Sequence, residues 1–136
     1  MFNEKDVLKI FNSAYSDFSK KNKINCSLKL VNQEEFNKIA RKCKLVQDNL
    51  KLAIVPLVGA LTEHLLDRDI VYASPDILNE ITDDKNFVKA IFMHEFYHIL
   101  FKRKVKKNSS KEELKSENRV NKQLAKDFPK LARYMN

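Results

Sequence analysis

The chain has 136 residues, of which 43% are hydrophobic and 32% charged, so it has the length and the apolar content of one compact domain spanning residues 1–136. Its single glycine, Gly59, excludes the glycine-rich loops that bind nucleotides. The 26 basic and 18 acidic residues give a net charge of +8, but the lysines are scattered through every segment, so charge alone does not favour a nucleic-acid partner.

The first third of the chain predicts a helix, a strand and a second helix. Residues 3–6 resemble a helix cap, and apolar residues recur at helical spacing up to the basic break at 20–23. Apolar and polar residues alternate from 24 to 30, as in a strand with one buried face. A capping box at 32–35 then opens a helix with one apolar stripe.

The two cysteines and the N-terminus bear on the compartment. Cys26 and Cys43 fall on the inward faces of their predicted elements, so we interpret both thiols as core residues. Two cysteines without a CxxC pair fit a reducing environment. Residues 1–11 mix charges with apolar side chains, unlike a signal peptide, and no apolar run is long enough to cross a bilayer. We therefore expect a cytoplasmic protein without a membrane segment.

The middle of the chain is rich in strand signals. The continuous apolar run at 51–59 predicts a buried strand, which Pro56 restricts to a sheet edge or a bulge. The sequence of residues 60–67 does not distinguish between a helix, a strand and a loop. Asp69 to Ala73 predicts a short strand, and Ser74-Pro75 then opens a short helix.

Two longer helices follow. The first, from about 85 to 102, is apolar nearly all round and is expected to be the central buried helix. A basic loop separates it from a helix at about 111–126, and Phe128-Pro129 ends or bends that helix before a short tail. The run of basic residues at 102–107 is more simply a solvated loop than a nucleic-acid patch.

The apolar helix contains the sharpest chemical signal, His94-Glu95-Phe96-Tyr97-His98. Histidines four residues apart lie on one helix face, where both imidazoles can reach one zinc ion. Glu95 is offset toward the place of a water on that metal, so it is the candidate general base. Two imidazoles in an apolar helix also require something to satisfy them. We therefore predict one zinc ion per chain.

The last long helix offers the third ligand that a catalytic zinc needs. Counted by threes and fours, its inward stripe is Leu114, Glu117, Asn121, Leu124 and Phe128. Glu117 in an apolar stripe is explained if it binds the metal, and Asn121, one turn on, can then bond a ligating residue. Glu113, one turn earlier, is the alternative ligand.

The two helices together resemble the gluzincin metallopeptidases, in which an H-E-x-x-H helix is followed by a helix bearing E-x-x-A-[ND]. Glu117 to Asn121 is similar to that second motif, with Val120 in the place of the alanine. The resemblance covers residues 69–126 and extends to the single-domain minigluzincins and the ImmA/IrrE-like peptidases. It implies that Ile70, Val71 and Tyr72 pair with an extended substrate. It also implies that residues 129–136 cover the cleft in a latent, zymogen-like form.

The sequence thus predicts an α+β, zincin-like domain, with a small mixed sheet packed on the zinc helix and the Glu117 helix closing the site. The predicted function is zinc-dependent hydrolysis of peptide bonds in a peptide or protein substrate. His64 is a further candidate, as the group that stabilises the oxyanion. Two alternatives stay open: a zinc-bound regulatory protein that does not cleave its partner, and a basic nucleic-acid-binding module. Self-association is a further open question.

Overall fold

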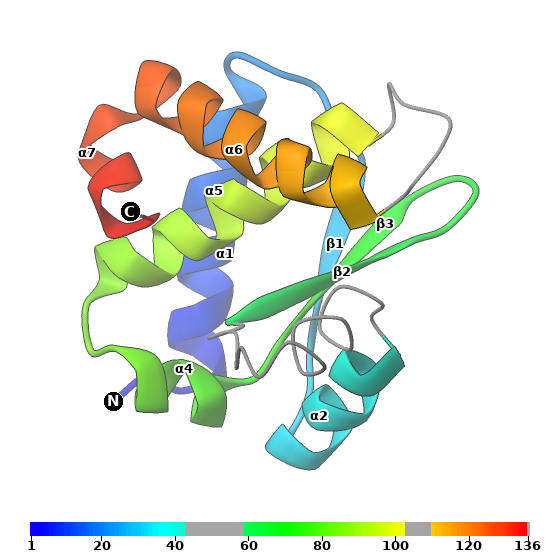
Figure 1. The fold of residues 1–136 in the computed structure, drawn as a ribbon. Coiled ribbons are helices and arrows are strands. Elements are labelled where there is room, and N and C mark those ends of the chain that lie inside the picture. Colours follow the sequence, from blue (N-terminus) through cyan, green and yellow to red (C-terminus); the bar gives the residue numbers. More distant parts are fainter. Residues whose placement is uncertain (43–58, 103–109, 136) are drawn as a thin grey trace.

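The computed structural model describes residues 1–42, 59–102 and 110–135, and for residues 42, 102, 110–117 and 135 it describes the backbone alone. The described elements form an α+β domain (Figure 1). They are α1 (Glu4–Ser19), β1 (Cys26–Leu30), α2 (Gln33–Lys42), β2 (Ala60–His64), β3 (Asp69–Ala73), α4 (Pro75–Ile81), α5 (Lys85–Lys102), α6 (Ser110–Asp127), α7 (Pro129–Ala132) and the short 3-10 helix η1 (Arg133–Met135). Residues 51–58 of the strand predicted at 51–59, and Cys43, lie outside the described residues.

A small mixed sheet has the order β1-β3-β2. β1 runs parallel to β3, and β2 runs antiparallel to it through a tight connection. β2 occupies the segment whose sequence was ambiguous. Because β3 is hydrogen-bonded on both sides, it is the central strand, and β2 is the outer strand of the sheet in the described part of the chain.

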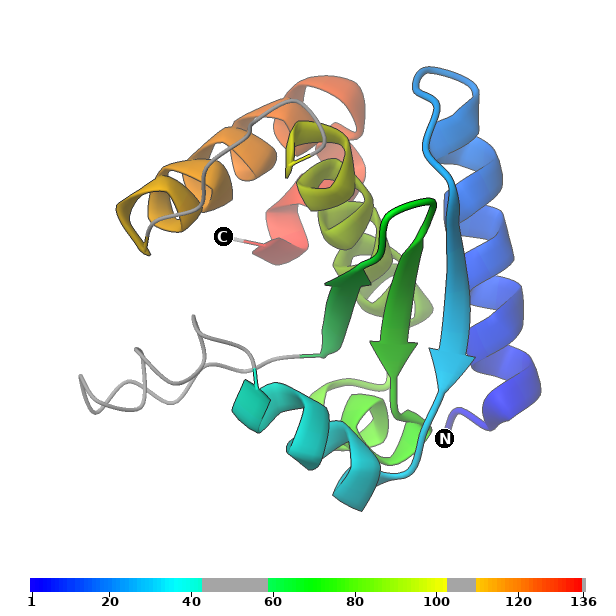
Figure 2. The same cartoon turned by 90° about the vertical axis from the view of Figure 1, so that its right-hand side faces the viewer.

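Helices cover both faces of the sheet (Figure 2). α1 and α5 pack on one face, where Val71 of β3 joins their common core. α2 packs on the other face, where Phe36 meets Leu61 and Tyr72. α5, the helix that contains the His94 to His98 motif, therefore lies behind a small mixed sheet, as predicted.

Local signals explain where the helices begin. The Asn3 side chain accepts a hydrogen bond from the Asp6 backbone and Asp6 returns one to Asn3, so the predicted cap of α1 is confirmed. At α2, Asn32 Oδ1 accepts from the backbone of Glu35 at 2.8 Å. These bonds satisfy backbone N–H groups that the first helical turn leaves without partners.

α5 is the centre of the core. Seven of its described side chains are fully buried: Val88, Ala90, Phe92, Met93, Phe96, Tyr97 and Ile99. Phe11 of α1 packs edge-on against Phe92 and Phe96, and Lys89 forms an ion pair with Asp17 at 2.5 Å. Aromatic edge contacts and one cross-helix ion pair thus fix α1 on α5.

α6 returns alongside α5, and Val120 and Leu124 are its fully buried contacts. Beyond it, Tyr134 of η1 donates a hydrogen bond to Asp84 at 2.9 Å and packs edge-on against Phe87. These contacts lie at the N-terminal end of α5, two turns or more before His94. These contacts of Tyr134 are therefore remote from the histidines, and a cleft-covering role for residues 129–136 stays a prediction.

None of the described helices combines the length and the apolar character that crossing a bilayer requires.

Candidate metal and catalytic site

His94 and His98 meet on one face of α5, as their spacing predicts. Their Nε2 atoms lie 3.0 Å apart, and their rings stand edge to face with centroids 4.6 Å apart. Both side chains are half-buried on α5, which contributes many residues to the main core. The fold therefore places two imidazole nitrogens at one point.

This pair fits a zinc ion. Two nitrogens bonded to one tetrahedral zinc at about 2.0–2.1 Å lie about 3.3 Å apart, so a small outward movement of either ring admits the metal. Two facing ring nitrogens can share only one proton between them, and a shared cation satisfies both. The chemistry of the donors and their convergence both suit zinc.

Glu95 is held by the outer strand. The Thr62 hydroxyl donates to Glu95 Oε2 at 2.8 Å, from β2 to α5. Thr62 was not singled out from the sequence, because the segment around it was ambiguous. No local signal could have identified this contact, since 33 residues separate the two side chains.

The third ligand is not tested by the structure. Glu117 lies in α6, but its side chain and that of Glu113 are outside the described side chains. Within the described part of the chain, no three His, Cys, Asp or Glu side chains come together as a metal site. Asn121 Oδ1 is buried and accepts no hydrogen bond from any described group. Buried amide oxygens ordinarily accept a hydrogen bond, so this oxygen can still accept one.

His64 contacts a buried carboxylate. Its Nδ1 lies 2.6 Å from Asp69 Oδ1, and the two residues are paired in the register of β2 and β3. Asp69 is only 1% exposed, whereas the His64 side chain is 28% exposed. Asp69 was not predicted as a site residue. A carboxylate on Nδ1 fixes the ring orientation and directs Nε2 away from Asp69.

His64 lies on the same side of β2 as Thr62, because the two are two residues apart. Two strand residues advance about 6.6 Å, and the four helix residues from Glu95 to Ile99 advance about 6 Å. Ile99 and Asp69 line one cavity, which places Asp69 level with that turn of α5. His64 is thus at the level of the helix turn that follows Glu95.

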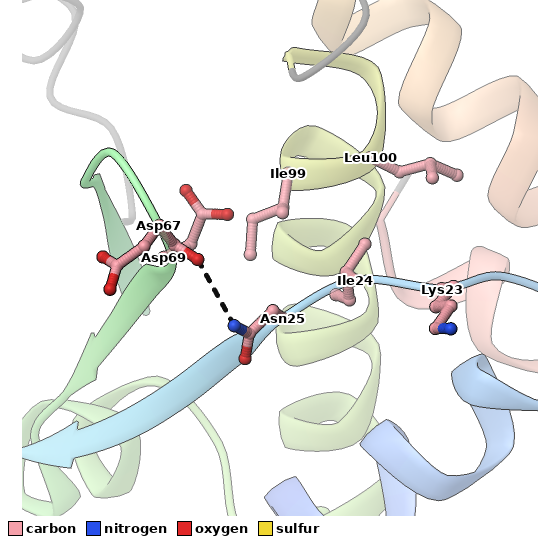
Figure 3. Close-up of a pocket in the computed structure, with 7 residues that line it drawn as sticks. All are labelled: Lys23, Ile24, Asn25, Asp67, Asp69, Ile99 and Leu100. Carbon is pink, nitrogen blue, oxygen red and sulfur yellow. Dashed lines mark hydrogen bonds between the residues drawn. The ribbon is translucent and has the colours of Figure 1, made fainter.

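The cavity has a volume of about 290 Å³ and lies at the C-terminal end of α5 (Figure 3). Its lining residues are Lys23, Ile24, Asn25, Asp67, Asp69, Ile99 and Leu100. Asn25 closes one side by donating from Nδ2 to the backbone oxygen of Asp67 at 3.3 Å. Since none of these residues belongs to the His94-Glu95-His98 motif, the cavity is a neighbour of the candidate site.

The predicted substrate strand is wrong. Ile70, Val71 and Tyr72 belong to the central strand, where β1 and β2 occupy both hydrogen-bonding edges. Their backbone has no edge left for an added peptide strand. The strand that contacts the motif is β2.

Cys26 is a core thiol. It packs against the main hydrophobic core, and burial together with the charge of Asp69 raises its pKa to about 12. At neutral pH the thiol therefore stays protonated and is a poor nucleophile. This agrees with its interpretation from the alternation at 24–30.

Comparisons with known proteins add no family: no family model, no curated protein and no solved structure matches this chain. The resemblance to gluzincins therefore depends on the two sequence motifs alone.

Proposed function

We propose that this chain is a zinc-dependent peptidase of gluzincin type. The observation that carries the proposal is the convergence of His94 and His98 Nε2 at 3.0 Å, with Glu95 on the adjoining position held from the outer strand. A half-buried pair of imidazoles beside a fixed carboxylate is the donor set of a hydrolytic zinc site.

In this proposal His94 and His98 would hold the metal and Glu117 would complete its protein ligands. When bound, zinc polarises a carbonyl group and acidifies a water molecule. Asn121, with its buried oxygen, would accept a hydrogen bond from a ligating imidazole and fix its orientation.

The other roles belong to side chains around that point. Glu95 accepts a proton from the attacking water and returns it to the leaving amine. His64, oriented by Asp69, presents Nε2 toward the substrate. As an imidazolium, with Nδ1 donating to Asp69, it would donate from Nε2 to the carbonyl oxygen as negative charge develops there.

The substrate would lie along β2. Thr62 joins this strand to Glu95, so the β2 backbone is the strand edge closest to the reacting group. An extended peptide could add there as a further strand, with its scissile bond facing Glu95.

The experiment is elemental analysis of the purified protein, after incubation with zinc, beside two variants. We expect one zinc per chain in the wild type and in His64→Ala, and loss of zinc in His94→Ala. His64→Ala is the matched control, because it removes the only histidine outside the pair. A wild-type chain without zinc would overturn the proposal.

Hydrolysis is then measured on a peptide library with the zinc-loaded protein. Glu95→Gln should keep its zinc and lose about 10²- to 10⁴-fold in kcat, the usual contribution of a general base. If the wild type binds zinc but cleaves no peptide, the chain is a zinc protein without peptidase activity. Binding to nucleic acid that falls steeply with salt and survives loss of both histidines would favour the basic module instead.

A further inference from the structure

The contact between Thr62 and Glu95 links an outer strand to the candidate general base. The Thr62 hydroxyl donates to Glu95 Oε2 at 2.8 Å, and both side chains are half-buried. A hydrogen bond to an ionised carboxylate is among the stronger kinds that proteins form.

The packing of β2 on α5 brings the two together. At Gly59, just before β2, an added Cβ would lie 2.8 Å from Ile91 Cδ1, so the backbone passes directly against the helix. Glu95 is one helical turn beyond Ile91 and shares its face. Ala60 is buried against the core, and Thr62, two residues on, points to the same side. A Cβ at position 59 would require the tip of the Ile91 side chain to shift.

Threonine suits this task. Thr62 is paired with Val71 in the ladder between β2 and β3, so its backbone is fixed, and its branched side chain has few rotamers. A glutamate loses rotamer entropy when it is ordered. A fixed donor supplies that ordering before any substrate arrives, which is the requirement for a general base.

We infer that Thr62 is a positioning residue for catalysis, which binds Glu95 Oε2 and so leaves Oε1 to accept the proton of the attacking water. The inference rests on the proposed function, because it assigns Glu95 the role of base. Thr62 itself touches neither the substrate nor the metal in this assignment.

Two substitutions test the inference on the zinc-loaded protein. Thr62→Val keeps the shape of the side chain and removes the hydroxyl, so kcat should fall about ten- to a hundredfold while KM and zinc content stay unchanged. Thr62→Ser keeps the hydroxyl and should restore most of kcat. Glu63→Gln is the control, because Glu63 faces the other side of β2 and contacts Tyr72. A Thr62→Val variant with wild-type kcat would overturn the inference and leave the proposed function intact.

A second measurement needs no activity. Urea unfolding of the metal-free chain is compared for wild type, Thr62→Val, Glu95→Ala and the double variant. Thr62→Val should lower the urea midpoint in the wild-type background and have little effect in the Glu95→Ala background. Equal shifts in the two backgrounds would overturn the inference, because they would mean that the two side chains do not interact. If the coupling is present but the wild type hydrolyses no peptide, the proposed function fails and Thr62 is left with a structural role only.

Discussion

Two polar clusters on α5 lie within a turn of each other and differ in how their hydrogen bonds are completed. In the first, the Tyr97 hydroxyl donates to Asp127 Oδ2 at 2.6 Å and Gln123 donates to the same oxygen at 3.0 Å. In the second, the Nε2 atoms of His94 and His98 face each other at 3.0 Å. The first cluster pairs donors with an acceptor, and the second brings two like atoms together.

The difference shows what each cluster is suited to do. Burial raises the pKa of Tyr97, and the neighbouring Asp127 raises it further, so the hydroxyl keeps its proton and remains a donor. That cluster fastens α6 to α5 and needs nothing more. Two facing imidazoles gain most from a cation between them. Polar residues in an apolar helix therefore indicate function when they bring like ligand atoms together at one point.

Among the substitutions that test this difference between the clusters, the largest effect is expected at Glu117, the proposed third zinc ligand. Glu117→Ala should lower zinc affinity by about a hundredfold or more, because loss of even an outer partner of a ligand typically costs ten- to a hundredfold. The free energy of unfolding of the metal-free chain should change little. Zinc affinity is measured by competition with a chelator of known affinity, and unfolding with urea.

Glu113→Ala is the matched control on the same helix, one turn earlier. It should leave zinc affinity unchanged if Glu117 is the ligand. The reverse pattern, with affinity lost only in Glu113→Ala, would transfer the role to Glu113 and shift the metal by one turn along α6. Unchanged affinity in both variants would place the third ligand elsewhere in the chain.

The sequence predicted the helices well, because their signals are local. The apolar helix at 85–102 matches α5, and the strand at 69–73 matches β3. Helical periodicity and capping residues act within a few positions of each other, so a single sequence contains them. The His94, Glu95 and His98 arrangement was predictable for the same reason, since one helical turn sets it.

The features that depend on strand order, namely the identity of β2 and the side-chain contacts across it, could not be predicted from the sequence. β2 has only two buried residues at its start and exposed ones at its end, so its alternation is weak. Its identity as a strand comes from pairing with β3, and that pairing makes β3 central rather than open to substrate. The contacts of Thr62 with Glu95 and of His64 with Asp69 depend on that register. A prediction from spacing along one element cannot include them.

A smaller effect is expected in the cluster of Tyr97, Gln123 and Asp127. Tyr97→Phe removes the hydroxyl from a fully buried position and should lower the free energy of unfolding by about 1.5–3 kcal/mol at neutral pH, as for other hydrogen bonds to a charged group. Zinc content should be unchanged, because the variant leaves the histidines in place. A loss of zinc would mean that the two clusters are not independent.

The same variant should change the response to acid. Burial raises the pKa of Asp127, but the hydrogen bonds from Tyr97 and Gln123 outweigh it, so the pKa is lowered overall. A carboxyl group with a lowered pKa in the folded state stabilises the fold above its ordinary pKa, and this contribution is lost as pH falls through the folded-state value. Tyr97→Phe should therefore flatten the loss of stability below about pH 4, measured by urea unfolding across pH. An unchanged pH dependence would remove Tyr97 as the cause.

The smallest effect is expected at the far end of α5, where Tyr134 donates to Asp84 at 2.9 Å. The backbone of Asn86, together with Tyr134, lowers the pKa of Asp84, so the carboxylate accepts this bond throughout the neutral range. Tyr134→Phe keeps the ring against Phe87 and removes only the hydroxyl. It should lower Tm by less than Tyr97→Phe and leave peptide hydrolysis unchanged, because the bond lies two turns or more from His94. A rise in hydrolysis would instead mean that loosening residues 129–136 opens the site, and the latent form implied by the gluzincin resemblance would then describe this chain.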